Sequence, residues 1–438
     1  MLPVLMAFGF AFVWACSYWS NRDLFSPTKL YLVTLCVCFL DIFLTPYRIE
    51  ICCIFVGLLL VPLVLVAYES GIAGQFRRLI QSHKKRAASP PLPAGRMVLL
   101  IWLLTIGPVL SITYLVSLFG GLKNYLDQLA VRALALRGLN TLTEPAIDLI
   151  SLLTVLYFGI GLIEKRRASW WMCYALHFTI AVTILSMSGS RRYFLMPLVM
   201  MLATAHYVRA EISIKRACGV LALLLVATSL FGMLRMGRRG QEFLTRDLDV
   251  YELESLTYHF KYGLIPLEVI LSADVIDLHY GSTFVAAITN LIPRPLWPGK
   301  PDSASLVITK EYLGDPWLGT GNISAGLLAE SIMNFGFVIG ICVSFVILLV
   351  GMGFLMCRYA KVLSFMRFSN RSVSGLFELI RYLNIALAIT GLITWETAIV
   401  VPPLILNLGA LWVIERLLAP KFASGQLRME WNLGVPIV

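Results

Sequence analysis

The sequence is short of charged residues. Only 14% of its 438 residues are Asp, Glu, Lys or Arg, against about 25% in an ordinary soluble domain. Apolar residues make up 58%, so the polar groups are too few to cover the surface of a water-soluble protein of this length. These proportions exclude a soluble enzyme, a disordered chain and a disulfide-stapled secreted domain. They indicate a membrane protein with many spans.

The sequence also lacks the motifs of several common enzyme classes. It contains no P-loop, no G-x-S-x-G and no dinucleotide-binding fingerprint. Its nine cysteines fall in or beside apolar runs and form no CxxC pair or Cys/His cluster that would hold zinc. Asp247-Leu248-Asp249 has the D-x-D spacing by which some sugar transferases hold a divalent metal, but chance alone often produces it. We therefore expect neither a metal nor another cofactor.

Apolar runs long enough to cross a bilayer recur along the chain. We predict an all-α polytopic membrane protein, with residues 1–438 forming a single membrane domain of about 11 spans. The expected spans are 2–19, 30–46, 51–68, 97–118, 146–163, 170–187, 193–208, 217–234, 328–356, 377–395 and 398–414. The long 328–356 run either is tilted or begins as a surface helix. No basic residue precedes the first run, so we expect a retained span and not a cleaved signal peptide.

Lysine and arginine predict the orientation of these spans. The net charge of +11 would suit a nucleic-acid partner, but the charges fall in short clusters between apolar runs, which is typical of membrane topology. Every second loop is basic; these loops hold Arg22 and Lys29, Arg77 to Arg96, Lys165 to Arg167, Arg209 to Arg216, Arg358 to Arg371, and Arg416 to Arg428. We predict that these loops are cytoplasmic, which places the N-terminus outside and the C-terminus inside.

Two long segments remain on the outer side. The loop 119–145 resembles an amphipathic surface helix whose Arg132 and Arg137 would lie at headgroup level, where anchoring to lipid is the simpler role. The loop 235–327 is the largest piece outside the spans. Its aromatic, apolar and Pro/Gly content is unlike that of a disordered linker, so we expect it to fold against the membrane domain.

Basic residues on the outer side run against the orientation rule and therefore need a reason. Arg191 and Arg192 follow Ser188-Gly189-Ser190 at the end of a span. They would either reach lipid headgroups or bind phosphate oxygens bidentately. Arg235 and Arg239 begin the long outer loop, and positive charge close to the membrane suits a phosphate held at headgroup level.

The densest local pattern is the segment 292–302, Ile-Pro-Arg-Pro-Leu-Trp-Pro-Gly-Lys-Pro-Asp. Its prolines stiffen the backbone, while Arg294 and Lys300 flank Trp297, a residue that favours the membrane interface. Such a rigid cationic segment would position a lipid-linked phosphate. A purely structural crossing loop remains the alternative.

Carboxylates on the outer side are candidate bases. Glu330 and Glu396 begin or end apolar runs, where burial would raise their pKa values and suit them to accept a proton. Either residue could instead be the structural partner of an arginine. Glu311 and Asp315 are further acidic candidates, and His279 is expected to be a hydrogen-bonding loop residue.

At these residues the chain resembles the O-antigen polymerase (Wzy) family over nearly its full length. The features that carry the resemblance are Gly189-Ser190-Arg191, the segment 293–301, Glu330 with Asn334-Phe335-Gly336 and Gly340, and Gly120-Gly121-Leu122 followed by Arg132 and Arg137. The resemblance implies a bacterial inner-membrane enzyme similar to the multi-span lipid-dependent (GT-C-like) glycosyltransferases. It would join undecaprenyl-diphosphate-linked oligosaccharide repeat units at the periplasmic face.

The resemblance also implies roles for individual residues. Arg191, Arg294 and Lys300 would hold the diphosphate, Glu330 would lie near the reaction centre, and Glu396 is a second candidate base. The remaining predicted substrate-binding residues are Arg132, Arg137, Arg192, Arg235 and Arg239. A flippase and a chain-length regulator are the implied protein partners.

Two other functions fit the same sequence. A ligase that joins finished glycan to the lipid A core would hold the diphosphate with the same basic residues, and only its acceptor would differ. A non-enzymatic transporter or flippase of lipid-linked sugars would need charged residues deep in its spans. The best such residues are Asp41, Asp148, His177 and Arg381, and most of them lie closer to span ends than to span centres.

Overall fold

The computed structural model describes residues 2–82, 94–128, 140–164, 166–187, 191–209, 211–220, 222–223, 261–292, 296–314, 323–368 and 373–418. All regular secondary structure in these ranges is helical. Eight of the described helices are long and apolar enough to cross a membrane. The prediction of a polytopic helical membrane protein is therefore confirmed, while the predicted number of spans stays a prediction.

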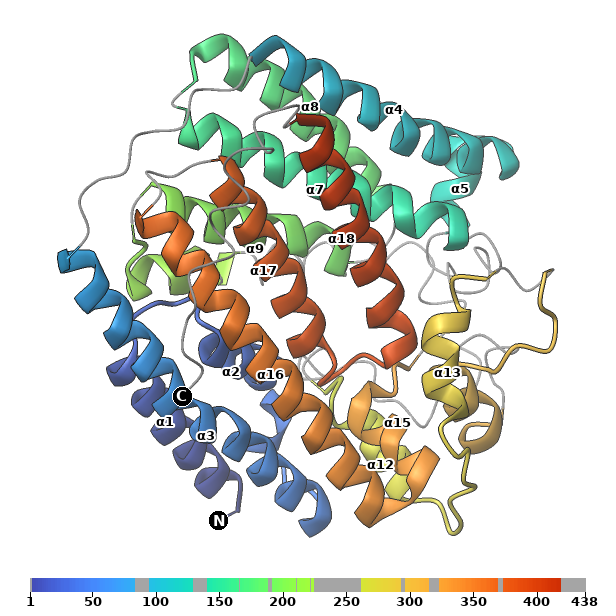
Figure 1. Ribbon diagram of the computed structural model, residues 1–438. Helices are drawn as coiled ribbons and strands as arrows, with labels where there is room; N and C mark the ends of the chain where they lie inside the picture. Colours follow the sequence, from blue (N-terminus) through green and yellow to red (C-terminus); the bar gives the residue numbers. More distant parts are fainter. Residues whose placement is uncertain are drawn as a thin grey trace.

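The long helices form one bundle (Figure 1). They are α1 (Leu2–Ser20), α3 (Ile49–Ser82), α4 (Ala94–Leu118), α7 (Asn140–Ile163), α8 (Ala168–Met187), α9 (Arg191–Val208), α16 (Phe337–Phe368), α17 (Val373–Gly391) and α18 (Thr397–Leu418). The short elements are α2 (Pro27–Cys38), η1 (Leu40–Phe43), α5 (Leu122–Gln128), α12 (Ile265–Leu271), α13 (Ser282–Thr289), α14 (Ala304–Val307), η4 (Ile308–Tyr312) and α15 (Gly326–Phe335).

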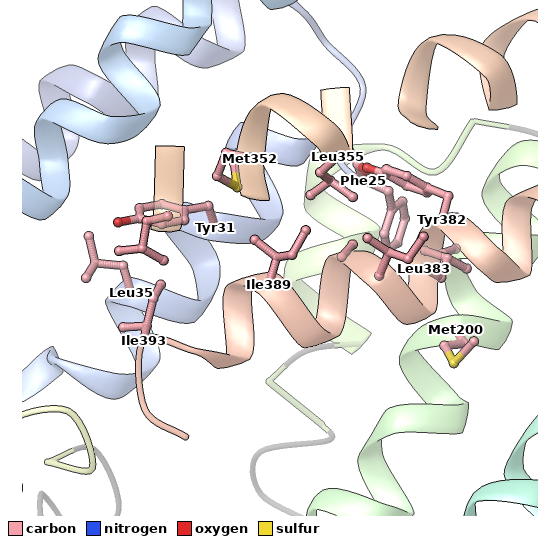
Figure 2. Packing of buried hydrophobic residues seen from close by; sticks show 14 of the residues in the cluster. Phe25, Tyr31, Leu35, Met200, Met352, Leu355, Tyr382, Leu383, Ile389 and Ile393 are labelled. Carbon is pink, nitrogen blue, oxygen red and sulfur yellow. The ribbon is translucent and has the colours of Figure 1, made fainter. Parts of the chain in front are cut away.

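Helix α17 is the centre of the bundle. It packs against α16, α18, α7, α9 and α2, and most of its side chains are buried. Figure 2 shows part of this core, in which Tyr382 and Ile389 of α17 lie among Met352 of α16, Tyr31 of α2 and Met200 of α9. A helix that is buried among other helices has a mostly apolar sequence, which is why the sequence predicts a span over 377–395.

Two predicted spans differ from the structure. The 30–46 run forms only the 12-residue helix α2, followed by the short turn η1, and α2 is too short to cross a bilayer by itself. The 328–356 run is broken at Gly336, which has a left-handed φ of 78°; α15 lies before the break and α16 after it. Of the predicted 217–234 span, only 217–220 and 222–223 lie among the described residues.

At one end of the bundle, a buried polar network joins four segments; we call this the Asp23 end. The Asp23 carboxylate accepts hydrogen bonds from the hydroxyls of Tyr207 and Tyr359, both at 2.7 Å. Next to it, the Asn21 amide donates to Glu69 Oε1 at 2.8 Å. These contacts connect α9, α16 and α3 to the turn between α1 and α2, and they satisfy polar groups that would be costly to bury alone.

Basic residues of the predicted cytoplasmic loops lie at the Asp23 end. Arg358 on α16 donates to Glu378 of α17 at 2.5 Å. Arg381, which was predicted within a span and not in a loop, lies on α17 and bridges Glu378 and Glu415 of α18. Lys29 differs from the expectation, because it lies within α2, is fully buried and donates to Ser26 Oγ at 3.2 Å. It is thus part of the helix packing and not a loop cation.

The opposite end carries a compact group of short helices, which we call the cap: residues 261–292, 296–314 and 323–335. Figure 1 shows it at the lower right of the bundle. The cap is attached to the bundle by the Gly263 N–H, which donates to the Cys38 carbonyl at 3.1 Å, and by an ion pair between Lys261 and Asp41 at 3.3 Å. The prediction that the long loop folds against the membrane domain holds for this described part.

Helix α15 packs so closely on α16 that only glycine fits between them. A Cβ atom at Gly340 would lie 2.5 Å from the Ser331 carbonyl oxygen and 2.6 Å from the Ile332 nitrogen. These are backbone atoms and cannot rotate away. Gly353, on the same helix, has no atom within 4 Å of the equivalent position.

These two glycines form a matched pair for a stability test. We expect Gly340→Ala to lower the free energy of unfolding by about 1–3 kcal/mol, because overpacking forces backbone shifts. Gly353→Ala should instead raise it by up to about 1 kcal/mol, because Ala has the higher helix propensity. Thermal unfolding of the two variants in the same detergent measures the difference, and equal midpoints would contradict the close α15–α16 contact.

Candidate functional site

Two carboxylates from distant parts of the sequence meet where the cap joins α18. Glu330 lies on α15, and Glu396 lies in the turn between α17 and α18, so both are outside the eight candidate spanning helices. Their exposed fractions are 0% and 1%. Both were predicted as candidate bases, and the structure brings the two together.

Glu330 is held by donors from both sides of this junction. Its Oε2 accepts the Thr397 backbone N–H at 2.8 Å, and its Oε1 accepts the Thr397 hydroxyl at 2.8 Å. The hydroxyl of Thr283 on α13 donates to the same Oε1 at 3.2 Å. Thr283 in turn accepts a hydrogen bond from the Asn334 amide at 2.6 Å. Glu330 therefore fixes the start of α18 against α13 and α15.

Glu396 is held in the same way by the start of α14. Its Oε1 accepts the Ser305 hydroxyl at 2.9 Å, and its Oε2 accepts the Ser305 backbone N–H. The Ser303 hydroxyl lies 3.2 Å from that of Ser305. Within the described chain, the groups that hydrogen-bond to the two carboxylates are thus hydroxyls and backbone N–H groups, not guanidinium or ammonium groups.

This environment favours a proton on the pair. Burial raises the pKa of Glu330. Burial, together with the nearby charge of Glu330, raises the pKa of Glu396 to about 8. Two carboxylates in one dry site do not both ionise easily, so one of them keeps its proton at neutral pH. A pair that can both hold and accept a proton is the arrangement that general acid–base chemistry requires.

Lys300 lies close to this junction. Its ammonium group donates to the Ile292 carbonyl at 2.9 Å, and to the Thr289 carbonyl and Asn290 Oδ1 at 3.4 Å each. A cation at the C-terminal end of a helix stabilises the unpaired carbonyls there, and α13 ends at Thr289. Asn290 also donates to the Ala398 carbonyl of α18 at 3.4 Å. Lys300 is therefore two contacts away from Ala398, which follows Glu396 by two residues.

The other predicted phosphate-binding residues lie largely outside the described residues. Arg191 and Arg192 form the first turn of α9, but their side chains are not described. Those outside the described ranges altogether are Arg132, Arg137, Arg235, Arg239 and Arg294. The assignment of these residues to a diphosphate stays a prediction.

One polar pair in the cap had no signal in the sequence. His279 Nε2 lies 2.9 Å from Glu311 Oε2, and both side chains are partly exposed. The two residues are 32 positions apart, so no local pattern predicts the contact. The His279 backbone N–H donates to the Met333 carbonyl at 3.0 Å, which places the pair beside the end of α15.

No metal site is visible where the structure can be described. In the described ranges, no group of three or more His, Cys, Asp or Glu side chains could hold a metal ion. Asp247 and Asp249 lie outside those ranges.

Comparisons with known proteins do not identify the chain. No protein-family model, no curated protein and no solved structure matches it.

The raised pKa of Glu396 makes stability depend on pH. The folded protein keeps this proton up to about pH 8, whereas an unfolded glutamate loses it near pH 4.3. Between these values the unfolded state binds fewer protons, so the contribution of Glu396 to stability is present at low pH and is lost as the pH rises toward 8. Glu396→Gln, which resembles the protonated form, should remove this loss.

Thermal unfolding measured from about pH 5 to about pH 8 tests this expectation. The midpoint of the wild type should fall more steeply with pH than that of Glu396→Gln. Glu211→Gln, an exposed position at the Asp23 end, is the matched control and should keep the wild-type slope. If Glu396→Gln also keeps that slope, the residue does not hold a proton in the folded protein.

Proposed function

We propose that the chain is a bacterial inner-membrane glycosyltransferase that polymerises oligosaccharide repeat units carried on undecaprenyl diphosphate. The observation that carries the proposal is the buried, hydrogen-bonded pair Glu330 and Glu396 at the cap end of a multi-span bundle. The cap end would face the periplasm, because the basic loops lie at the Asp23 end. The N-terminus would then be periplasmic and the C-terminus cytoplasmic.

In the proposed reaction, a sugar hydroxyl of one lipid-linked unit attacks the anomeric carbon of another. The new glycosidic C–O bond forms as the bond from that carbon to the diphosphate oxygen breaks. The proton of the hydroxyl passes to Glu330 or Glu396, and undecaprenyl diphosphate leaves with the electron pair. The diphosphate is already a good leaving group, so the protein mainly has to stabilise its developing charge.

Lys300 supports the placement of that charge. Three neutral oxygens hold its ammonium group beside the start of α18, which preorganises a cation near the carboxylate pair. Arg191 and Arg294 are the further proposed donors, and fixed donors of this kind stabilise a phosphate leaving group without a metal.

Access to the carboxylates requires movement of the cap. Because both side chains are almost completely buried, a sugar hydroxyl reaches them only after the bonds between Glu330 and Thr283, or between Glu396 and Ser305, open. Enzymes commonly close such elements over the substrate to exclude water. In the proposed cycle the described form is the closed one.

A transporter of lipid-linked sugars is the second candidate, and one observation favours it. A small cavity inside the bundle is lined by Asp148, Ser151, Asn384 and Asn407, among others, and polar groups at membrane depth are typical of substrate pathways.

Deletion in the native host distinguishes the functions. Loss of a polymerase leaves glycan of a single repeat unit, whereas loss of a ligase leaves none, and loss of a flippase strands the units on the cytoplasmic face.

The polymerase proposal makes a prediction for the carboxylates. Glu330→Gln and Glu396→Gln keep the shape of the site but cannot accept a proton as a carboxylate does, so each should abolish the long bands of the lipopolysaccharide ladder. Glu211→Gln should leave the ladder unchanged. The ladder is read at matched membrane levels of each variant, and a normal ladder in both Gln variants would refute the proposed base.

The proposed phosphate donors have their own test. Arg191→Ala and Arg294→Ala should each lower the polymerisation rate about 10²–10³-fold, as removal of a charge-stabilising donor does. Arg191→Lys separates bidentate recognition from simple charge. The control is Arg167→Ala, an exposed arginine at the Asp23 end. Wild-type rates in both alanine variants would show that Arg191 and Arg294 do not stabilise the diphosphate.

A further inference from the structure

Helices α15 and α16 form a tight antiparallel hairpin. Gly340 lies against Ser331, and further along, the Ser344 hydroxyl donates to the Leu327 carbonyl at 3.2 Å. The residue number rises on α16 as it falls on α15, so the two helices run in opposite directions from the turn at Gly336. The start of α15 at Gly326 therefore lies alongside α16 and not beyond its end.

The position of this hairpin relative to the bilayer follows from α16. Residues 337–357 are uncharged, and Arg358 follows them directly. These 21 residues span about 31 Å of helix, which matches the hydrocarbon thickness of about 30 Å. Val338 and Ile339, at the cap end of the stretch, are 70% and 62% exposed. A hydrocarbon layer that begins at Arg358 would therefore reach about Phe337.

Residues of the hairpin would lie inside this layer. Ser344 is seven residues from Phe337, about 10 Å along the helix. Its hydroxyl donates a hydrogen bond to the Leu327 carbonyl, so Leu327 lies at the same depth. The Leu327 N–H donates to the Leu392 carbonyl at 2.8 Å, so the turn between α17 and α18 lies at a similar depth. The start of α18 gives an independent estimate of this depth. Thr397 precedes Glu415 by 18 residues, which is about 27 Å of helix and less than the hydrocarbon thickness of about 30 Å.

The outward face of α13 is apolar. Val285 and Ile288, three positions apart on one side of the helix, are exposed, and so are Leu291, Ile292 and Leu296 in the chain that follows. The opposite side of α13, with Ala286 and Ala287, packs against α18 and α15. Further along α18, Ile405 and Leu406 are also exposed. The apolar face of α13 thus continues the lipid-facing surface of α18.

We infer that α13 and α15 form a re-entrant element in the bilayer leaflet on the cap side, and that Val285, Ile288 and Leu296 contact its acyl chains. A patch of this kind in water would be an aggregation or docking surface. The backbone polar groups of α15 are compatible with this depth because α15 is helical and buried in protein. The inference holds for a polymerase or a transporter alike.

Spin-label accessibility tests the inference on the full chain in lipid nanodiscs. A genetically encoded keto amino acid, labelled with a hydroxylamine spin label, is placed at position 288 and leaves the nine cysteines in place. The lipid control is position 346, where Val346 is exposed on α16; the water control is position 274, where Asp274 is exposed in the cap. We expect the label at 288 to match that at 346, with high collision rates with oxygen and low rates with a water-soluble nickel chelate.

A second measurement covers the case in which the labelled protein does not fold. Ile288→Asp places a charge against acyl chains and should lower the unfolding temperature, whereas Ser272→Asp, at an exposed cap position, should not. A label at 288 with the accessibility of the label at 274, or equal unfolding temperatures of the two Asp variants, would overturn the inference. Both readouts are independent of catalysis, so their failure is distinguishable from failure of the proposed function.

Discussion

The junction at Glu330 and Glu396 organises the cap end of the molecule. Glu330 connects α13, α15 and the start of α18, and Glu396 connects α14 to the turn before α18. Two carboxylates buried together are destabilising unless hydrogen bonds and a retained proton compensate for the loss of water. The threonine and serine donors supply the hydrogen bonds. The raised pKa of Glu396 lets this residue keep its proton at neutral pH. A stable fold alone would be served as well by apolar side chains at these positions, which supports the proposed chemical role of the pair.

Charged side chains are buried in different ways at the two ends of the bundle. At the Asp23 end, arginines and glutamates pair across α16, α17 and α18, and the tyrosine hydroxyls that surround Asp23 hold that end together. At the cap end, Glu330 and Glu396 have neutral partners and depend on protonation, although the ion pair of Lys261 with Asp41 also attaches the cap. Opening the junction at Glu330 and Glu396 would therefore require breaking hydrogen bonds to hydroxyls and backbone N–H groups rather than an ion-pair network. In the proposed cycle, this junction is the part that opens.

The sequence is a good guide to the bundle and a partial guide to the site. Long apolar runs predict α3, α7 and α18 because hydrocarbon thickness leaves few alternatives for such segments. The length of the 328–356 run allows for a separate helix at its start, but the sequence does not predict the break at Gly336. The apolar composition continues through this position, and only the left-handed φ and the close approach at Gly340 reveal the hairpin. Glu330 and Glu396 could be selected from their positions at the ends of apolar runs. Their meeting depends on the fold of α15, and contacts such as His279 with Glu311 have no local pattern at all.

The most direct test of the central claim is the infrared difference spectrum between the wild type and Glu396→Gln, recorded in lipid as a function of pH. The wild type should show the C=O stretch of a protonated carboxyl group at neutral pH, and this band should disappear as the pH passes about 8. The variant should lack it. If the difference spectrum shows no protonated carboxyl group at neutral pH, the pair does not hold a proton and the proposed acid–base role is contradicted.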